Sequence, residues 1–163
     1  MQNQKFDPVA VRQTQLKYPT SAISAFADGK GYAVGSIEGR CSIVNIEFNN
    51  PDAEHEKDFC FKCHRKEDAA NKDGDIWTVN HITFNKQYNT FATSGSDGTF
   101  IIWNKDTKSR YKQSNAAPLP ITVSCFSDDA NILMFASGED WSLGGTAATM
   151  RQNVVKLYVR ACE

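Results

Sequence analysis

The residues with the plainest chemical potential in this chain are two cysteines and a histidine in the stretch CFKCH, which contains Cys60, Cys63 and His64. The order Cys-x-x-Cys-His is that of covalent c-type haem attachment, and a Cys-x-x-Cys pair is half of many zinc sites. The stretch is expected to form a β-strand, in which side chains three positions apart point to opposite faces. No second Cys or His pair at ligand spacing follows it. We therefore expect neither haem nor metal, and interpret both cysteines as packed thiols.

Other residues of catalytic type also lack the partners that catalysis needs. His55 lies in the acidic stretch NNPDAEHEKD, which is typical of a solvated loop, and His81 has no Ser or Cys nucleophile with an orienting acid. The triplet DGD at Asp73 and the pair GG at Gly144 do not open a helix after a strand, as a phosphate-binding loop would. We expect no enzyme and no cofactor.

Composition and charge are those of a soluble globular domain. The chain has 163 residues, 40% of them hydrophobic, and 18 Lys and Arg against 19 Asp and Glu leave a net charge of -1. This balance creates no global attraction for nucleic acid or anionic membranes. The apolar run 132–136 is too short to cross a bilayer and the N-terminus has no signal-peptide pattern, so we expect a cytosolic or nuclear protein without membrane insertion. In such a compartment the odd set of five cysteines is expected to be free thiols: Cys41, Cys60, Cys63, Cys125 and Cys162.

The elements that must position any site come from a repeat. Three segments carry a Phe near their end, SAISAFA, TVNHITFN and ITVSCFS, and each is followed by a polar turn and a small-residue-rich run, GYAVGS, TFATSGS and ILMFASG. A Gly-containing turn and a third apolar run follow in each copy, CSIVNIEF, TFIIWN and NVVKLYV. Phe26 and Phe84 are 58 positions apart and Gly39 and Gly98 are 59 apart, so the first two copies are nearly in register.

These short runs are rich in Val, Ile, Thr and Phe and predict β-strands. DFCFKC and KSRYKQ add a fourth strand to the first two copies. Four antiparallel strands per repeat are typical of a β-propeller blade, so we predict an all-β fold of about three blades. The predicted divisions are 1–20 as the end of a preceding blade or a linker, 21–63, 64–114 and 115–163 as blades, and 138–152 as a long loop.

Three blades cannot close a ring, because propellers have about four to eight. Exposed blade faces and unpaired strand edges would favour aggregation. We therefore expect a second chain, or further blades, to complete the propeller.

The second copy resembles a WD repeat. In GSDGTFIIWN, Asp97 lies in the turn between the second and third strands, and Trp103 stands where that family has its Trp-Asp pair. The family buries a hydrogen-bonded set of His, Ser, Asp and Trp in a blade. The resemblance implies that His64, Ser94, Asp97 and Trp103 form this set and specify structure rather than chemistry.

The longest loops of the predicted fold share one face of the propeller, where binding residues are common. Arg40 and Arg65 lie there on neighbouring blades, and two arginines can hold carboxylates of one peptide by bidentate hydrogen bonds. Trp141, in the loop 138–152, either folds back onto its blade or forms an exposed aromatic contact.

Together GSIEGR, FKCHR, NTFATSGSDGTFIIWNKDTK and ASGEDWSLG resemble the last three blades of the nuclear mRNA export factors of the WD-repeat class, over about residues 16–160. This resemblance implies a seven-bladed scaffold that binds a GLEBS motif, a short segment of a nucleoporin, with Arg40 and Arg65 on its acidic residues. It also implies a groove at Asp140, Trp141 and Arg151 for single-stranded RNA or a peptide, and a place in the nucleus, at the nuclear envelope and pore, with shuttling to the cytoplasm.

A related family, the mitotic spindle checkpoint WD-repeat proteins, shares similar segments and binds GLEBS motifs of checkpoint kinases. It is the alternative function. The sequence leaves open which GLEBS partner is bound, whether RNA is bound directly, the oligomeric state, and whether the other four blades were truncated or are supplied by another chain.

Overall fold

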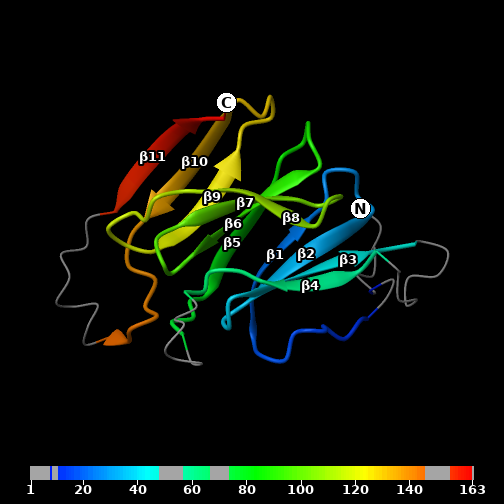
Figure 1. The fold of residues 1–163 in the computed structure, drawn as a ribbon, viewed down its shortest axis with the longest axis horizontal. Helices are drawn as coiled ribbons and strands as arrows, with labels where there is room; N and C mark the ends of the chain where they lie inside the picture. The colour runs from blue at the N-terminus through cyan, green and yellow to red at the C-terminus, as the bar shows by residue number, and fades with distance from the viewer. Residues whose placement is uncertain (1–7, 9–10, 48–56, 67–73, 146–154, 163) are drawn as a thin grey trace, which may run out of the picture.

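The structure, a computed structural model, describes residues 8, 11–47, 57–66, 74–145 and 155–162. In these residues the strands form three antiparallel sheets that follow one another along the chain (Figure 1). The first sheet is β1 (Thr20–Ala25), β2 (Gly31–Ser36), β3 (Arg40–Asn45) and β4 (Phe59–Lys62). The second is β5 (Val79–Phe84), β6 (Thr90–Gly95), β7 (Phe100–Asn104) and β8 (Ser109–Gln113). The third is β9 (Ile121–Phe126), β10 (Ile132–Ser137) and β11 (Lys156–Ala161).

The three sheets are copies of one backbone unit. A backbone hydrogen bond joins the end of the second strand to the residue before the first strand in each sheet: Ile37 to Pro19 at 3.1 Å, Ser96 to Thr78 at 3.0 Å and Gly138 to Pro120 at 3.0 Å. The pairing of the first two strands is also interrupted by a register shift near the start of β1, β5 and β9. The predicted all-β repeat of propeller blades is confirmed for the described residues.

The sheets pack face to face, with their first strands on the inside. β5 contacts β1 on one side and β9 on the other, so the three sheets are arranged around a common inner edge. The core between the first and second sheets contains Ile43, Val79 and Phe91, and that between the second and third contains Phe100 and Leu133. Burial of these side chains supplies the main favourable free energy of folding.

The pleat of β6 shows how one strand serves both cores. Phe91 and Thr93 belong to its face toward the first sheet, and Ala92 and Ser94 to its face toward the third, because alternate residues of a strand point to opposite faces. All four are buried. Gly98 follows in the turn to β7 with φ +74°, where an added Cβ would lie 2.6 Å from the carbonyl oxygen of Ala117. Only glycine fits this turn without strain.

In the part of the chain the structure describes, the third sheet has one fully open face, and its edge strand β11 is unpaired on one side. β11 pairs with β10 alone. On the face away from the second sheet, Leu157 is 81% exposed and Val159 is 70% exposed, and Met134 and Val123 lie across from them on β10 and β9. Contiguous exposed apolar surface of this kind is typical of an interface. No helix among the described residues is long and apolar enough to cross a membrane.

This open face predicts self-association of the chain. Leu157→Lys combined with Val159→Lys should reduce concentration-dependent aggregation, because it replaces exposed apolar area with charge, and should leave the melting temperature within about 2 °C, since such surface changes cost little. Dynamic light scattering over a concentration series measures the first effect and thermal denaturation the second.

Leu133→Lys provides the contrast, because Leu133 is only 1% exposed on the opposite face. It should unfold the third sheet. Unchanged aggregation in the double variant would show that this face is not the source of association.

Candidate interaction surface

A buried chain of hydrogen bonds joins the end of the first sheet to the second. The indole Nε1–H of Trp103 donates to Thr93 Oγ1 at 3.0 Å, and Thr93 Oγ1 lies 3.0 Å from His64 Nε2. His64 Nδ1 lies 2.9 and 3.0 Å from the two carboxylate oxygens of Asp97. Since the threonine hydroxyl accepts from Trp103, its own proton can go to His64 Nε2. The neutral imidazole then carries its proton on Nδ1 and donates it to Asp97.

The hydroxyl in this chain belongs to Thr93, whereas the sequence predicted Ser94. Ser94 lies on the other face of β6 and donates to Ser124 Oγ at 2.8 Å across the boundary with the third sheet. The reason is the pleat of the sheet. Phe91 pairs with Trp103 and lies on the same face. Because alternate residues of a strand share a face, the next residue of β6 on the face of Trp103 is Thr93. Counting from the Trp instead of from the small residues of TFATSGS would have found Thr93.

Asp97 is held as a carboxylate. Burial raises its pKa, but hydrogen bonds from His64 and from the backbone and hydroxyl of Thr99 outweigh burial, and the net pKa lies below its usual value of 3.8. The carboxylate accepts from the N–H and the hydroxyl of Thr99 in the turn and from the imidazole of His64. It therefore ties the turn between β6 and β7 to His64.

His64 is also packed against the backbone of β6. It has φ +47°, which is uncommon for a residue other than glycine. A Cβ added to Gly95 would lie 2.5 Å from His64 Nδ1, so the ring needs a glycine beneath it. Trp77 N–H donates to the His64 carbonyl at 3.0 Å, and Arg65 pairs with Ile76 in an antiparallel bridge. These contacts fix the backbone that carries Arg65.

The structure brings Arg40 and Arg65 together on one carboxylate of the chain itself. Glu38 Oε2 lies 3.5 Å from Arg40 Nε and 3.7 Å from an Nη of Arg65. Arg65 Nε also donates to the Gly39 carbonyl at 3.3 Å, and its Nη2 donates to the Glu38 carbonyl. Two guanidiniums against one carboxylate leave a local excess of one positive charge. The arrangement already binds one carboxylate, and its outward side can take another.

Apolar side chains border this arginine pair. Ile37, in the turn before Glu38, is 45% exposed, and Ile76, paired with Arg65, is 48% exposed. We call the surface made by Ile37, Glu38, Arg40, Arg65 and Ile76 the arginine face. It combines charge with exposed apolar area, which suits a protein segment better than a free ion.

The structure gives Trp141 an exposed position on the turn that follows β10. The side chain is 64% exposed, and its backbone has φ +62°, a strained value for a bulky residue. Its neighbour Asp140 is anchored to the second sheet, accepting from Asn80 Nδ2 at 2.9 Å and from Ser96 Oγ. Burial raises the pKa of Asp140, but hydrogen bonds from Ser96, Ser142 and Asn80 hold it below its usual value. Asp140 thus fixes the turn that presents Trp141.

Among the other residues considered from sequence, Arg151 and His55 lie outside the described residues. Cys60 is exposed and Cys63 is buried, and burial raises the pKa of the Cys63 thiol. Burial also lowers the pKa of His81, whose Nδ1 lies 3.5 Å from a Ser124 hydroxyl that is closed to solvent. The described residues contain no group of three or more His, Cys, Asp or Glu placed to hold a metal ion.

Repeated antiparallel sheets of three or four strands define the chain as a group of WD-repeat β-propeller blades, and so does the Trp, Thr, His and Asp hydrogen-bonded set between the first two sheets. Proteins of similar sequence support this class. The chain is 42% identical over 131 residues to the poly(A)+ RNA export protein of Schizosaccharomyces pombe and 43% identical over 133 residues to Protein RAE1 of Arabidopsis thaliana. It is 35% identical over 129 residues to a WD40 repeat protein, poxJ, of Penicillium oxalicum.

These matches cover 80%, 81% and 79% of the chain, and 36%, 35% and 36% of the three relatives, so the chain spans about a third of their length. No protein-family model matches. The chain is thus built of WD-repeat blades, and the relatives that it matches include mRNA export factors.

Thr93 provides a direct test of the buried hydrogen-bonded chain. Thr93→Val keeps the shape but removes the hydroxyl, which leaves Trp103 Nε1–H and His64 Nε2 without a partner. It should cost about 2–4 kcal/mol of unfolding free energy, because each buried polar group left unpaired costs roughly 1–3 kcal/mol. Ser94→Ala, the matched control, should cost about 1 kcal/mol. Urea denaturation measures both, and equal costs would contradict the assignment.

The lowered pKa of Asp97 predicts that the stability of the fold decreases in acid. Because its pKa is lowered by folding, its contribution is fully present above the unfolded value near 3.8 and is lost as pH falls through the lower folded value. The melting temperature should therefore decrease as the pH is lowered below about 4. The Asp97→Asn variant should have a lower melting temperature at pH 7, and its melting temperature should depend less on pH in acid. A variant whose acid limb is as steep as that of the parent would contradict this role.

Proposed function

We propose that the chain acts in mRNA export from the nucleus, as a non-enzymatic scaffold that docks at the nuclear pore. Its similarity to the poly(A)+ RNA export protein and to RAE1 over about four fifths of its length supports this role. The ligand of the arginine face is an acidic segment of a nucleoporin, the GLEBS motif. The observation that carries this proposal is the convergence of Arg40 and Arg65 on a single carboxylate, that of Glu38.

The chemistry of the arginine face matches a segment with acidic and apolar residues. A guanidinium offers several N–H donors in a fixed plane, so Arg40 can retain its contact with Glu38 and still donate outward. Its side chain is 37% exposed, compared with 17% for Arg65, so Arg40 is the more accessible donor. Arg65 is anchored by backbone carbonyls and sets the geometry. Ile37 and Ile76 would cover an apolar side chain next to the bound carboxylate.

Trp141 extends the same interaction to the third sheet. An exposed Trp in a strained backbone conformation is unfavourable for the free chain, and such strain is typical of a binding site. Leu143, which is 58% exposed, adds apolar area beside it, and Glu139 and Asp140 add negative charge. Negative charge repels phosphate and carboxylate alike, so we assign Trp141 to an apolar side chain of the docked segment rather than to RNA.

In the functional assembly, further propeller blades cover the open face of the third sheet. The exposed Leu157 and Val159 and the unpaired edge of β11 support this proposal. Such blades come from a second chain or from the remainder of a longer one. Association through this face is independent of the arginine face.

The docking proposal is tested with a labelled GLEBS peptide from a nucleoporin. Arg40→Gln combined with Arg65→Gln should weaken binding at least about tenfold, because hydrogen bonds to charged groups contribute roughly 1.5–3 kcal/mol each. Fluorescence anisotropy measures the affinity, and thermal denaturation checks that the variant is folded. Arg110→Gln with Lys156→Gln, which removes two exposed cations elsewhere, should bind as the parent does. Retained binding in the first variant ends the proposal.

A GLEBS peptide from a checkpoint kinase serves as competitor in the same assay. Under this proposal it displaces the nucleoporin peptide only at higher concentration. Stronger competition by the kinase peptide would reassign the chain to the spindle checkpoint.

A further inference from the structure

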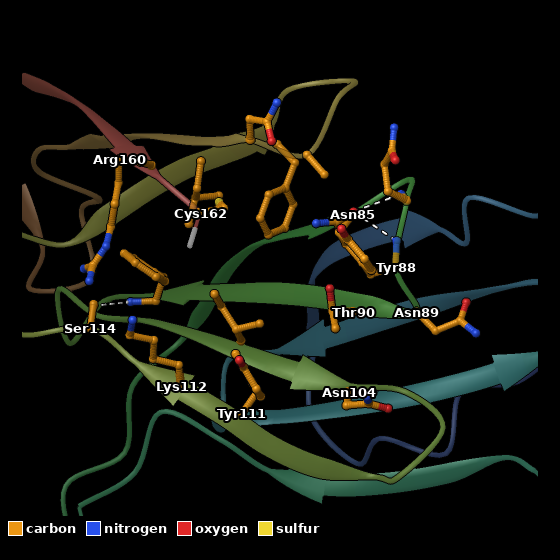
Figure 2. Close-up of a pocket in the computed structure, with 18 of the residues that line it drawn as sticks. Asn85, Tyr88, Asn89, Thr90, Asn104, Tyr111, Lys112, Ser114, Arg160 and Cys162 are labelled. Atoms are coloured by element: carbon orange, nitrogen blue, oxygen red, sulfur yellow. Dashed lines mark hydrogen bonds between the residues drawn. The ribbon is translucent and has the colours of Figure 1, made fainter.

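The boundary between the second and third sheets contains a groove of about 630 Å³ that the arginine face does not share. Figure 2 shows β7 and β8 on one side and β11 on the other, with Lys112 and Arg160 projecting from opposite walls. The apolar part of the lining is formed by Phe100, Ile102 and Leu133. This volume is in the range of ligand and peptide sites.

The groove exists because aromatic residues of the first boundary are replaced in the second. On the first sheet, Phe59 pairs with Ile43 and Phe61 pairs with Cys41. On the second sheet, Lys112 pairs with Ile102, the counterpart of Ile43. Lys112 thus stands where the first sheet has Phe59.

Ser114 replaces Phe61 in the same way. It exchanges two hydrogen bonds with Phe100, the counterpart of Cys41: Ser114 N–H donates to the Phe100 carbonyl at 3.0 Å, and Phe100 N–H donates to Ser114 Oγ at 3.0 Å. A small hydroxyl therefore occupies the position of a phenyl ring.

The facing sheet shows a third replacement. Trp103 pairs with Phe91 in the second sheet, and Arg160 pairs with Leu133 in the third. In the first boundary the Trp103 ring packs on Phe61, with centroids 4.5 Å apart. In the second, Arg160 lies with its guanidinium carbon 5.6 Å from the Phe100 ring centroid.

The two replacement cations have no acidic partner within the described part of the chain. Among the residues the structure describes, neither Lys112 nor Arg160 forms an ion pair, and both are exposed. Asp106, the one acidic residue of the lining, accepts from Asn89 Nδ2 at 2.8 Å. The groove therefore has an apolar floor, amide groups at one end, and a net charge of one positive unit from Lys112 and Arg160 against Asp106.

A second hollow, between the first and second sheets, lies beside the same turn. The two share the turn between β5 and β6, with Asn85, Gln87, Tyr88 and Asn89 lining both. The second hollow is also lined by Lys105, by Asp28 and by Lys86, which is paired with Asp128. A linear segment that passes over this turn can reach both hollows, whereas a compact small molecule would fill only one.

We propose that this groove binds an acidic peptide segment of a second protein. A large apolar side chain of the segment lies on Phe100, Ile102 and Leu133, and flanking carboxylates contact Lys112 and Arg160. The site uses none of the arginine-face residues, so the proposal stands independently of the docking proposal above.

The test uses a fluorescein-labelled peptide with one phenylalanine between two glutamates, flanked by glycine and serine, in anisotropy titrations of the whole chain. Lys112→Glu with Arg160→Glu should weaken binding roughly tenfold or more and reverse its salt dependence. Lys112→Phe, which restores the aromatic fill of the first boundary, should also abolish binding without lowering the melting temperature. Arg110→Glu with Lys156→Glu, the matched control, should bind as the parent does.

The same assay checks whether binding depends on the charge of the peptide, whether it involves the arginine face, and whether the groove prefers RNA. A peptide with lysines in place of the glutamates should not bind, and Arg40→Gln with Arg65→Gln should leave binding of the acidic peptide unchanged. Equal binding by the folded Lys112→Glu, Arg160→Glu variant, or no binding by the parent, overturns the proposal. Tighter binding of an oligouridylate probe, lost in the same variant, would assign the groove to RNA and also overturn it.

Discussion

The structure depends most on the hydrogen bonds of one buried imidazole. His64 is 2% exposed, and both of its ring nitrogens would be costly to leave unpaired. Thr93 and Asp97 form hydrogen bonds with them, and the indole N–H of Trp103 donates to the Thr93 hydroxyl oxygen. The chain of bonds starts on β7, crosses β6 and ends in the turn that precedes β7. A histidine at the end of the first sheet is thereby locked to the second, and the backbone that continues from it carries Arg65.

The two boundaries between the sheets have the same backbone geometry but opposite side-chain chemistry. The first is closed by aromatic packing, with Phe61 against Trp103 at 4.5 Å and Phe84 against Phe91 at 5.0 Å. The second has a smaller core around Phe100 and a charged groove at its outer part. A repeat fold permits this difference because each boundary needs only enough apolar contact to hold neighbouring sheets together. The remaining positions are free to take on binding roles.

Much of the fold could be predicted from residue patterns, since strand periodicity and turn residues repeat along the chain. The positions of Asp97, Trp103 and His64 could be predicted too, because a WD repeat places them at fixed points. Thr93 was missed because two adjacent polar residues of β6 are both buried, on different faces. Glu38 was missed because its role exists only where Arg40 and Arg65 meet, 25 positions apart on different segments.

The sequence by itself determined that the chain forms repeated antiparallel sheets, because alternating side chains and glycine turns specify strand and connection locally. It also determined which residue types could bind a carboxylate. Tertiary structure alone decided which of these residues meet. The pleat chose Thr93 over Ser94, the packing of Asn80 and Ser96 against Asp140 presented Trp141 to solvent, and the match of β4 to β8 showed where a groove replaces a core. These outcomes depend on contacts between segments distant in sequence, so no local pattern contains them.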